Sequence, residues 1–193
     1  MDLSWGHEAL IPFITNVGLI TSDGPNGPNI MAAEWTHHVS YRPGLIAVHI
    51  GPHKATAENI RKTKQFGVNI CATDQAVMSS ISGNYSGREI DKIAALKELG
   101  FKFYKAKKIK TLMVEGAAMN AECKLVEEIP LGDHIMFVGE VIEASASGKD
   151  PFAYHQGRYW LLNTNVIKTS QEERERIRSV VEKHRKSVIK IKD

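Results

Sequence analysis

The fold is decided by the run Asn29-Ile30-Met31-Ala32-Ala33-Glu34-Trp35-Thr36-His37-His38-Val39-Ser40-Tyr41-Arg42-Pro43. Small residues open this run, and they allow the backbone to lie against a flat surface. An apolar strand follows, and the next segment is Pro52-His53-Lys54-Ala55-Thr56-Ala57-Glu58-Asn59-Ile60. That segment places a cation and a hydroxyl at the start of a helix, where an anion is stabilised. Together the two segments predict a site for a ligand with one flat end and one anionic end.

The chain is long enough to bury one sizeable core, because it has 193 residues of which 42% are apolar. No linker-like stretch divides it, so we expect a single domain over residues 1–193. The formal charge of +3 is too small to indicate nucleic acid as a partner, and basic residues do not alternate with aromatic ones. Basic residues concentrate in 102–110 and 183–192, and the first stretch is where an acidic redox partner would dock.

Two cysteines, Cys71 and Cys123, lie far apart in apolar runs that resemble strands, so we expect buried free thiols. No apolar run is long enough to span a bilayer and no secretion signal is recognisable, which predicts a cytoplasmic protein without membrane contact. His37 and His38 lie in an extended run and so point to opposite faces. We therefore expect no metal site.

The first half of the chain reads as strands separated by turn signals. Residues 16–21 and 29–34 form a predicted hairpin around the Gly/Pro/Asn-rich stretch 22–28. Residues 45–50 and 66–71 are predicted strands, and between them a helix over 56–64 is expected to be capped by Thr56.

The second half begins with an irregular region at 75–87, interpreted as a loop that leads into a helix over 89–99. A second, longer hairpin is predicted from residues 121–126 and 135–142 around Gly132-Asp133, followed by a last strand at 158–162. An amphipathic helix is expected over 171–186, with an apolar stripe at Ile177, Val180, Val181 and His184. Strands joined by turns, with helices inserted between them, favour a mainly β antiparallel barrel with peripheral helices.

Common catalytic signatures do not occur in this sequence. The sequence has no GxGxxG after its first strand, no Walker loop, no HExxH and no CxxC. This disfavours Rossmann-type nicotinamide enzymes, P-loop enzymes, zincins and standard serine hydrolases.

Four motifs occur in order: Gly-x-Asn-x-Met-Ala, Val-Ser-x-x-Pro, His-Lys-x-Thr-x-x-Asn-Ile and Phe-x-Val-Asn-Ile, at 27–32, 39–43, 53–60 and 66–70. Further matching segments are 82–83 with 91–92, 122–123, 131–141 and 154–159. The ordered set resembles the flavin reductase-like family of FMN-binding split β-barrels, near its flavoredoxin and archaeal ferric reductase branch. The resemblance covers about residues 10–165.

This resemblance implies FMN held non-covalently, with its ring against the backbone of residues 31–36 and its phosphate near the start of the helix that follows His53. The flavin would carry the chemistry, so no residue is assigned a catalytic role. The implied cofactor site consists of Asn29, Met31, Ala32, Ala33, Glu34, Trp35, Thr36, His53, Lys54, Thr56, Asn59, Ser82, Gly83, Lys92 and His155.

The resemblance also implies a homodimer with flavin near the subunit interface. Trp35 departs from members that serve monooxygenases, which often carry serine or asparagine there, and the helix at 171–186 lies beyond the shared region. Three functions stay open. They are an NAD(P)H-dependent flavin or ferric reductase that uses NADH or NADPH and a small-molecule electron acceptor, a flavoredoxin-type electron carrier reduced by a partner protein, and a split-barrel module for another planar phosphorylated cofactor.

Overall fold

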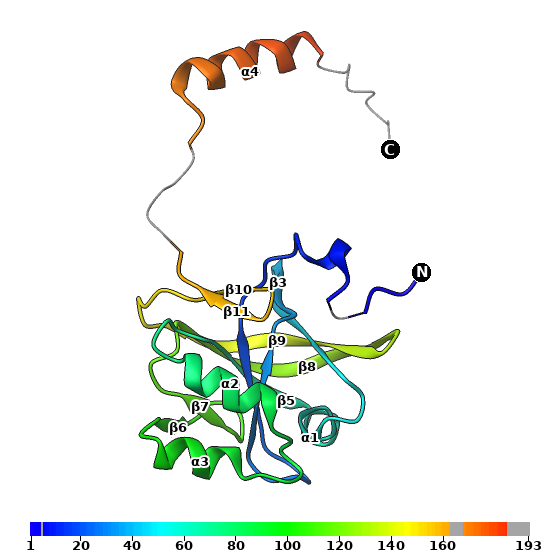
Figure 1. Ribbon diagram of the computed structural model, residues 1–193, viewed down its shortest axis with the longest axis vertical. Helices are drawn as coiled ribbons and strands as arrows, with labels where there is room; N and C mark the ends of the chain where they lie inside the picture. The colour runs from blue at the N-terminus through cyan, green and yellow to red at the C-terminus, as the bar shows by residue number, and fades with distance from the viewer. Residues whose placement is uncertain (5, 163–167, 185–193) are drawn as a thin grey trace. The chain divides into compact units, whose positions relative to one another are not determined.

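The computed structural model describes residues 1–4, 6–162 and 168–184, and the chain divides into two units, Met1–Leu162 and Asn163–Asp193. Figure 1 shows the elements of the first unit, most of them labelled. They are η1 (Glu8–Leu10), β1 (Gly18–Ser22), β2 (Asn29–Ala33), β3 (Thr36–Tyr41), β4 (Gly44–Ile50), α1 (Ala55–Thr63), β5 (Gln65–Ile70), α2 (Ala76–Asn84), α3 (Lys92–Glu98), β6 (Phe103–Lys105), β7 (Leu112–Val114), β8 (Met119–Leu131), β9 (His134–Ala146), β10 (Ala153–His155) and β11 (Arg158–Trp160).

The main sheet has seven strands in the order β2-β1-β5-β8-β9-β4-β3, and every pairing is antiparallel. Its first and last strands, β2 and β3, are joined by only Glu34 and Trp35. The sheet must therefore curl until its two edges approach each other, which makes a barrel that is split between β2 and β3 (Figure 1). The expected antiparallel split β-barrel with peripheral helices is confirmed.

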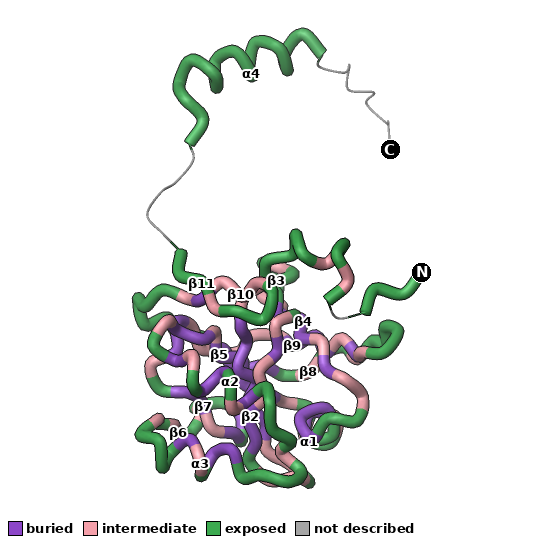
Figure 2. Tube along the Cα trace, in the orientation of Figure 1, coloured by how far each residue is buried: buried purple, intermediate pink, exposed green. Residues whose placement is uncertain are grey.

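The barrel wall is buried on both faces where helices cover it (Figure 2). All five residues of β1 are buried: Ile20 faces the barrel interior with Val68 and Phe137, while Leu19 packs with α2 and α3. Close approach across the wall leaves no room for a side chain at Gly18, where a Cβ atom would lie 2.3 Å from Thr36 Oγ1. The barrel thus offers α2 and α3 a rigid outer surface.

Both predicted hairpins are confirmed, as β1–β2 and β8–β9. The predicted cap of α1 is wrong. The N-cap residue is Lys54, and Thr56 lies inside the first turn, where its hydroxyl oxygen accepts a hydrogen bond from Asn29 Nδ2 at 2.9 Å. Thr56 was expected to satisfy the helix's own amides, but the contact with a neighbouring strand holds its hydroxyl instead.

The loop predicted at 75–87 is wrong over most of its length, because residues 76–84 form α2. Ser, Gly and Asn have poor intrinsic helix propensity, so the local sequence did not predict helix α2. Burial of Met78, Ser79 and Ser82 against the outer face of the barrel stabilises the helix through tertiary packing. The short β6–β7 hairpin was not predicted from the sequence. Most of the segment that connects its strands belongs to the basic stretch 102–110.

In the second unit, α4 (Gln171–Lys183) is capped by Ser170 Oγ, which accepts from Glu173 N at 3.1 Å. Its stripe residues Ile177, Val180 and Val181 are exposed. Positions 185 and 186 of the predicted helix lie outside the described residues. Among the residues that the structure describes, no helix is long and apolar enough to cross a membrane.

Candidate functional site

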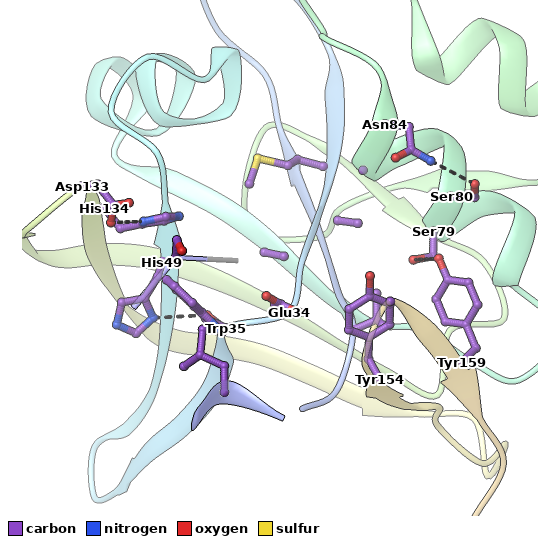
Figure 3. A pocket seen from close by; sticks show the side chains of 18 of the residues that line it. Glu34, Trp35, His49, Ser79, Ser80, Asn84, Asp133, His134, Tyr154 and Tyr159 are labelled. Carbon is purple, nitrogen blue, oxygen red and sulfur yellow. Dashed lines mark hydrogen bonds and ion pairs between the residues drawn. The ribbon is translucent and has the colours of Figure 1, made fainter. Parts of the chain in front are cut away.

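A cavity of about 600 Å³ opens beside the split in the barrel. One wall is the end of β2 from Met31 to Trp35, and a second is the face of α2 that carries Ser79, Ser80, Gly83 and Asn84. Figure 3 shows Tyr154 and Tyr159 on one side, with His49, His134 and Trp35 on the other. The remaining lining residues are Leu3, Ser4, Leu10, Val17, Asp133 and Gly157.

The small residues of β2 make one wall of the cavity mostly backbone. β2 pairs only with β1 and stands at the end of the strand order, so half of its backbone N–H and C=O groups face away from the described sheet. Ala32 and Ala33 carry only methyl side chains, which lets a planar molecule approach these groups closely. This is the segment at which the sequence predicts contact with the flat end of a ligand.

Aromatic side chains make the wall on the side of β10 and β11. Tyr159 donates from its hydroxyl to Ser79 Oγ at 2.9 Å, and its ring centroid lies 5.5 Å from that of Tyr154 and 5.1 Å from that of Phe152. The bond between Tyr159 and Ser79 joins β11 to α2. The Tyr159 ring is therefore held by its hydroxyl on α2 and by its contacts with the rings of Tyr154 and Phe152.

The opposite wall is a cluster of three aromatic rings. Trp35 is 40% exposed, and its ring centroid lies 4.7 Å from that of His134 and 6.2 Å from that of His49. His134 Nδ1 lies 2.7 Å from Asp133 Oδ1, and this hydrogen bond lowers the pKa of the Asp133 carboxyl. A hydrogen bond of 3.2 Å between His49 Nδ1 and the Trp35 carbonyl oxygen ties β4 to the connection between β2 and β3.

A basic end adjoins the α2 wall, and we define it by Lys54, Thr56, Ser82 and Lys92. Lys92 is only 3% exposed, and its Nζ donates to the Ser82 carbonyl oxygen at 3.1 Å. Among the described residues no carboxylate pairs with Lys92. Burial, helped by the nearby charge of Lys54, lowers the pKa of Lys92 to about 8. A buried lysine beside a second lysine, with no counterion, predicts an anionic ligand.

Two further kinds of hydrogen-bond donor at the basic end have no partner among the described residues. The hydroxyl of Ser82, 1% exposed, has no hydrogen-bond partner in the described structure. The amides of residues 55–57 at the start of α1 also have none, because Lys54 provides no side-chain cap. Thr56 accepts from Asn29, which leaves its own hydroxyl hydrogen free to donate. These donors suit a phosphate.

The side-chain amide of Asn59, by contrast, forms its hydrogen bonds with other residues of the protein. Its Nδ2 donates to Gly27 O at 2.9 Å and Ser22 Oγ at 3.2 Å, and its Oδ1 accepts from Asn26 N at 3.0 Å. This predicted ligand-binding residue therefore joins the β1–β2 turn to α1. It holds the basic end in shape.

The remaining predicted site residues have different surroundings. Gly83 lines the cavity. Thr36 is buried and donates to the Ala33 carbonyl oxygen at 3.0 Å, so it closes the bend between β2 and β3. His53 is exposed, and its carbonyl oxygen accepts from Arg88 at 3.4 Å. His155 does not line the cavity: its Nε2 lies 2.6 Å from Ile11 O.

Several cavity residues were absent from the predicted site, among them His49, Ser79 and Tyr154. No local pattern distinguishes His49 or Ser79, which come from β4 and α2 and are brought together only by the fold, whereas Tyr154 belongs to the segment 154–159 that matched the family pattern. The segment at 131–141 did match the family pattern, and it contains His134. Its contact with Trp35 was not foreseen.

The basic stretch 102–110 lies away from this cavity. Glu122, 3% exposed, accepts from the backbone amides of Lys107 at 2.8 Å and Lys108 at 2.6 Å, which fixes the β6–β7 connection. Glu122 pairs with Glu143 on β9, nine residues from His134. At roughly 3.3 Å a residue, Glu143 and His134 lie about 30 Å apart along β9.

Cys71 and Cys123 are buried free thiols, as predicted, and burial raises the pKa of each to about 12. Within residues 1–4, 6–162 and 168–184, no cluster of His, Cys, Asp and Glu is arranged to hold a metal ion.

Comparison with known proteins gives a consistent result. A family model described as "Flavin reductase like domain" matches residues 11–162. An NADH-dependent FMN reductase of Streptomyces nodosus subsp. asukaensis is 27% identical over 154 residues, which cover 77% of this chain and 78% of the relative. The solved flavin reductase PheA2 is 27% identical with a TM-score of 0.70, covering 85% of this chain and 100% of that one. Flavoredoxin from Methanosarcina acetivorans, 19% identical, shares the fold with a TM-score of 0.76 over 92% of this chain and 98% of its own.

Proposed function

The chain belongs to the flavin reductase-like family, and we propose that it is an FMN-binding oxidoreductase reduced by NADH or NADPH. The observation that carries this proposal is Lys92, a buried lysine that has no counterion among the described residues, next to the Ser82 hydroxyl, which has no hydrogen-bond partner among them. A phosphate monoester would supply the missing negative charge. The cavity beside it has room for a planar heterocycle.

The residues present fit this cofactor. Lys54, Thr56, Ser82, Lys92 and the amides that begin α1 would hold the phosphate, and the free backbone edge of Met31–Ala33 would hold the ring. Flavin, when bound, accepts a hydride and passes on its electrons. The protein's part is placement: β2 supplies hydrogen-bond donors and acceptors that are already fixed, and the walls of Trp35 and Tyr159 exclude water.

Flavin titration tests the cofactor. The purified apoprotein is titrated with FMN, FAD and riboflavin while flavin fluorescence is measured. Because the basic end suits a terminal phosphate, we expect FMN to bind most tightly and riboflavin, which lacks phosphate, at least about tenfold more weakly. Equal affinity for FMN and riboflavin would contradict the assigned phosphate site.

Nicotinamide addition in the absence of oxygen tests the activity. We expect NADH or NADPH to bleach the absorbance of bound flavin without another protein. A flavoprotein inert to both nicotinamides would be the electron carrier that a partner reduces. Absence of a flavin spectrum, with another chromophore in its place, would instead support a module for a different planar cofactor.

We also propose that the protein is a homodimer. Large apolar side chains are exposed on β3 and on the distal part of β8, namely Val39, Tyr41, Val126, Ile129 and Leu131. A surface of this kind suits a second copy of the chain. Sedimentation equilibrium at micromolar concentration would show a mass twice that of one chain, and a monomer at all concentrations would contradict the proposal.

A further inference from the structure

Glu34 is a carboxylate that the assignment of a cofactor site leaves unexplained. It lies in the two-residue connection between β2 and β3, partly buried, and lines the cavity. Figure 3 shows it between Trp35 and Tyr154. In the described part of the chain its side chain makes no hydrogen bond and no ion pair. We define the acidic end of the cavity by Glu34, Trp35, His134 and Tyr154.

The charges around Glu34 do not cancel it. The described lining of the cavity contains neither lysine nor arginine. Asp133, the other acidic lining residue, has a side chain that is 94% exposed and pairs with His134. The groups that face Glu34 are His134 from β9 and Tyr154 from β10. Burial raises the pKa of Glu34, while the charge of His134 opposes that rise. Burial and the charge of Glu34 raise the pKa of Tyr154, which keeps its phenol neutral.

The charge at this end is opposite to that of the basic end, where Lys54 and Lys92 attract anions. A single unpaired carboxylate in a cavity acts over several ångströms at low salt, because the surrounding protein screens it less than water does. Glu34 therefore makes the acidic end of the cavity unlike the basic end that adjoins the α2 wall.

We propose that Glu34 is a specificity-determining residue that selects the second redox substrate by charge. It favours acceptors that are neutral or cationic where they enter the cavity, and it disfavours anionic ones such as negatively charged ferric chelates. This inference rests on the proposed function. In the overall reaction each NADH becomes NAD⁺, releases one proton and delivers two electrons, so two ions of a one-electron acceptor are reduced.

The first experiment needs no flavin. Trp35 is a fluorescent reporter beside Glu34, and substituting Trp5 and Trp160 by Phe leaves it as the single tryptophan. Quenching of the apoprotein by iodide, caesium and neutral acrylamide is compared at pH 7.5 and low ionic strength. We expect Glu34→Gln to raise the iodide-to-caesium ratio about twofold or more, with acrylamide quenching unchanged.

Matched controls separate the local field from total charge. Glu34→Asp keeps the charge and should keep the original ratio. Glu98→Gln removes the same charge from the exposed end of α3, outside the cavity, and should leave the ratio unchanged. Glu34→Ser is a second neutral variant if Glu34→Gln is not recovered folded.

The second experiment measures selection. FMN-loaded protein is reduced anaerobically and mixed with ferricyanide, an anion, or hexaammineruthenium(III), a cation, and reoxidation is followed by stopped flow. We expect Glu34→Gln to shift the ratio of the two rates about tenfold toward ferricyanide, and high salt to abolish the shift. Because both variants bind the same flavin, the charge of the flavin cancels in this comparison.

The outcomes are distinguishable. A quenching ratio that responds to Glu34→Gln no more than to Glu98→Gln overturns the inference, and so does an acceptor ratio that stays constant while the protein binds and reduces FMN normally. Failure of FMN to bind the unsubstituted protein overturns the proposed function, and the selection role falls with it. The inference is supported if Glu34→Gln shifts both the quenching ratio and the acceptor ratio while Glu34→Asp and Glu98→Gln shift neither.

Discussion

The acidic end of the cavity and the basic end that adjoins the α2 wall place their charges in opposite ways. At the basic end Lys92 is 3% exposed and donates a hydrogen bond to a backbone carbonyl, and Lys54, the N-cap residue of α1, lies nearby. At the acidic end Glu34 is partly exposed and unpaired, beside a tryptophan that is 40% exposed. A buried unpaired charge costs stability unless a ligand compensates it, whereas a partly solvated one costs little. The first arrangement suits a cofactor that stays bound and the second a substrate that leaves.

The largest expected effect comes from Lys92. Replacing it by Met should weaken FMN binding about 30- to 150-fold, since a charge-assisted hydrogen bond contributes roughly 2–3 kcal/mol. Thermal unfolding of the apoprotein should not become easier, because the substitution removes an uncompensated buried charge. Lys97→Met, on the exposed face of α3, is the control and should bind FMN normally. Unchanged FMN affinity in the Lys92 variant would mean that the two ends do not differ as described.

The next effect is a pH dependence. The pKa of Lys92 is about 8 in the folded apoprotein, so one pH unit above it roughly a tenth of the molecules carry the charge. FMN should therefore bind about tenfold more weakly at pH 9 than at pH 7, and binding at pH 9 should take up a proton. Calorimetry in buffers of different ionisation enthalpy measures that uptake, which Lys92→Met should abolish.

The same pKa fixes the sign of the stability change. Lys92 loses its proton more easily folded than unfolded, so between about pH 8 and its ordinary pKa of 10.5 the unfolded chain binds more protons. Apoprotein stability should gain a contribution over that range as pH rises. The difference in stability between the wild type and Lys92→Met, measured by urea denaturation, should shrink accordingly. A constant difference would contradict the burial of a charged Lys92.

A smaller effect is expected at Ser82. Its buried hydroxyl lacks a partner, so Ser82→Ala should leave apoprotein stability unchanged or slightly higher while FMN binds about three- to tenfold more weakly. Fluorescence titration and thermal unfolding give the two readouts. Ser40→Ala, on β3 and away from the basic end, serves as the control. Destabilisation without a change in affinity would assign Ser82 a structural role only.

The smallest effect is expected on the aromatic wall. Tyr159→Phe removes the hydrogen bond to Ser79 and should cost about 1 kcal/mol of unfolding free energy. FMN affinity should stay within about threefold, because the ring still closes the wall. Ser79→Ala should give the same loss, and the double variant should lose no more than either single one. Additive losses would show that the two hydroxyls act separately.

Local patterns were sufficient where a segment's own residues set its structure. The Gly/Pro/Asn-rich stretch at 22–28 forces a turn, and alternation in 121–126 requires a half-buried strand, so both hairpins were predictable. Family resemblance, not residue pattern, brought Ser82 and Lys92 into the predicted site. The cap assigned to Thr56 failed because its hydroxyl accepts from Asn29, a strand residue 27 positions earlier.

The sequence by itself determined that strands dominate, that β1–β2 and β8–β9 are hairpins and that small residues meet a helix start, since these follow from side-chain period and turn chemistry within a few residues. Tertiary structure alone decided that residues 76–84 are helical, because packing on the barrel outweighs poor propensity. It also decided that Lys92 has no counterion and that Glu34 faces His134 and Tyr154 across a cavity. Burial and charge neighbours are properties of chain segments brought together in space, and no local pattern encodes them.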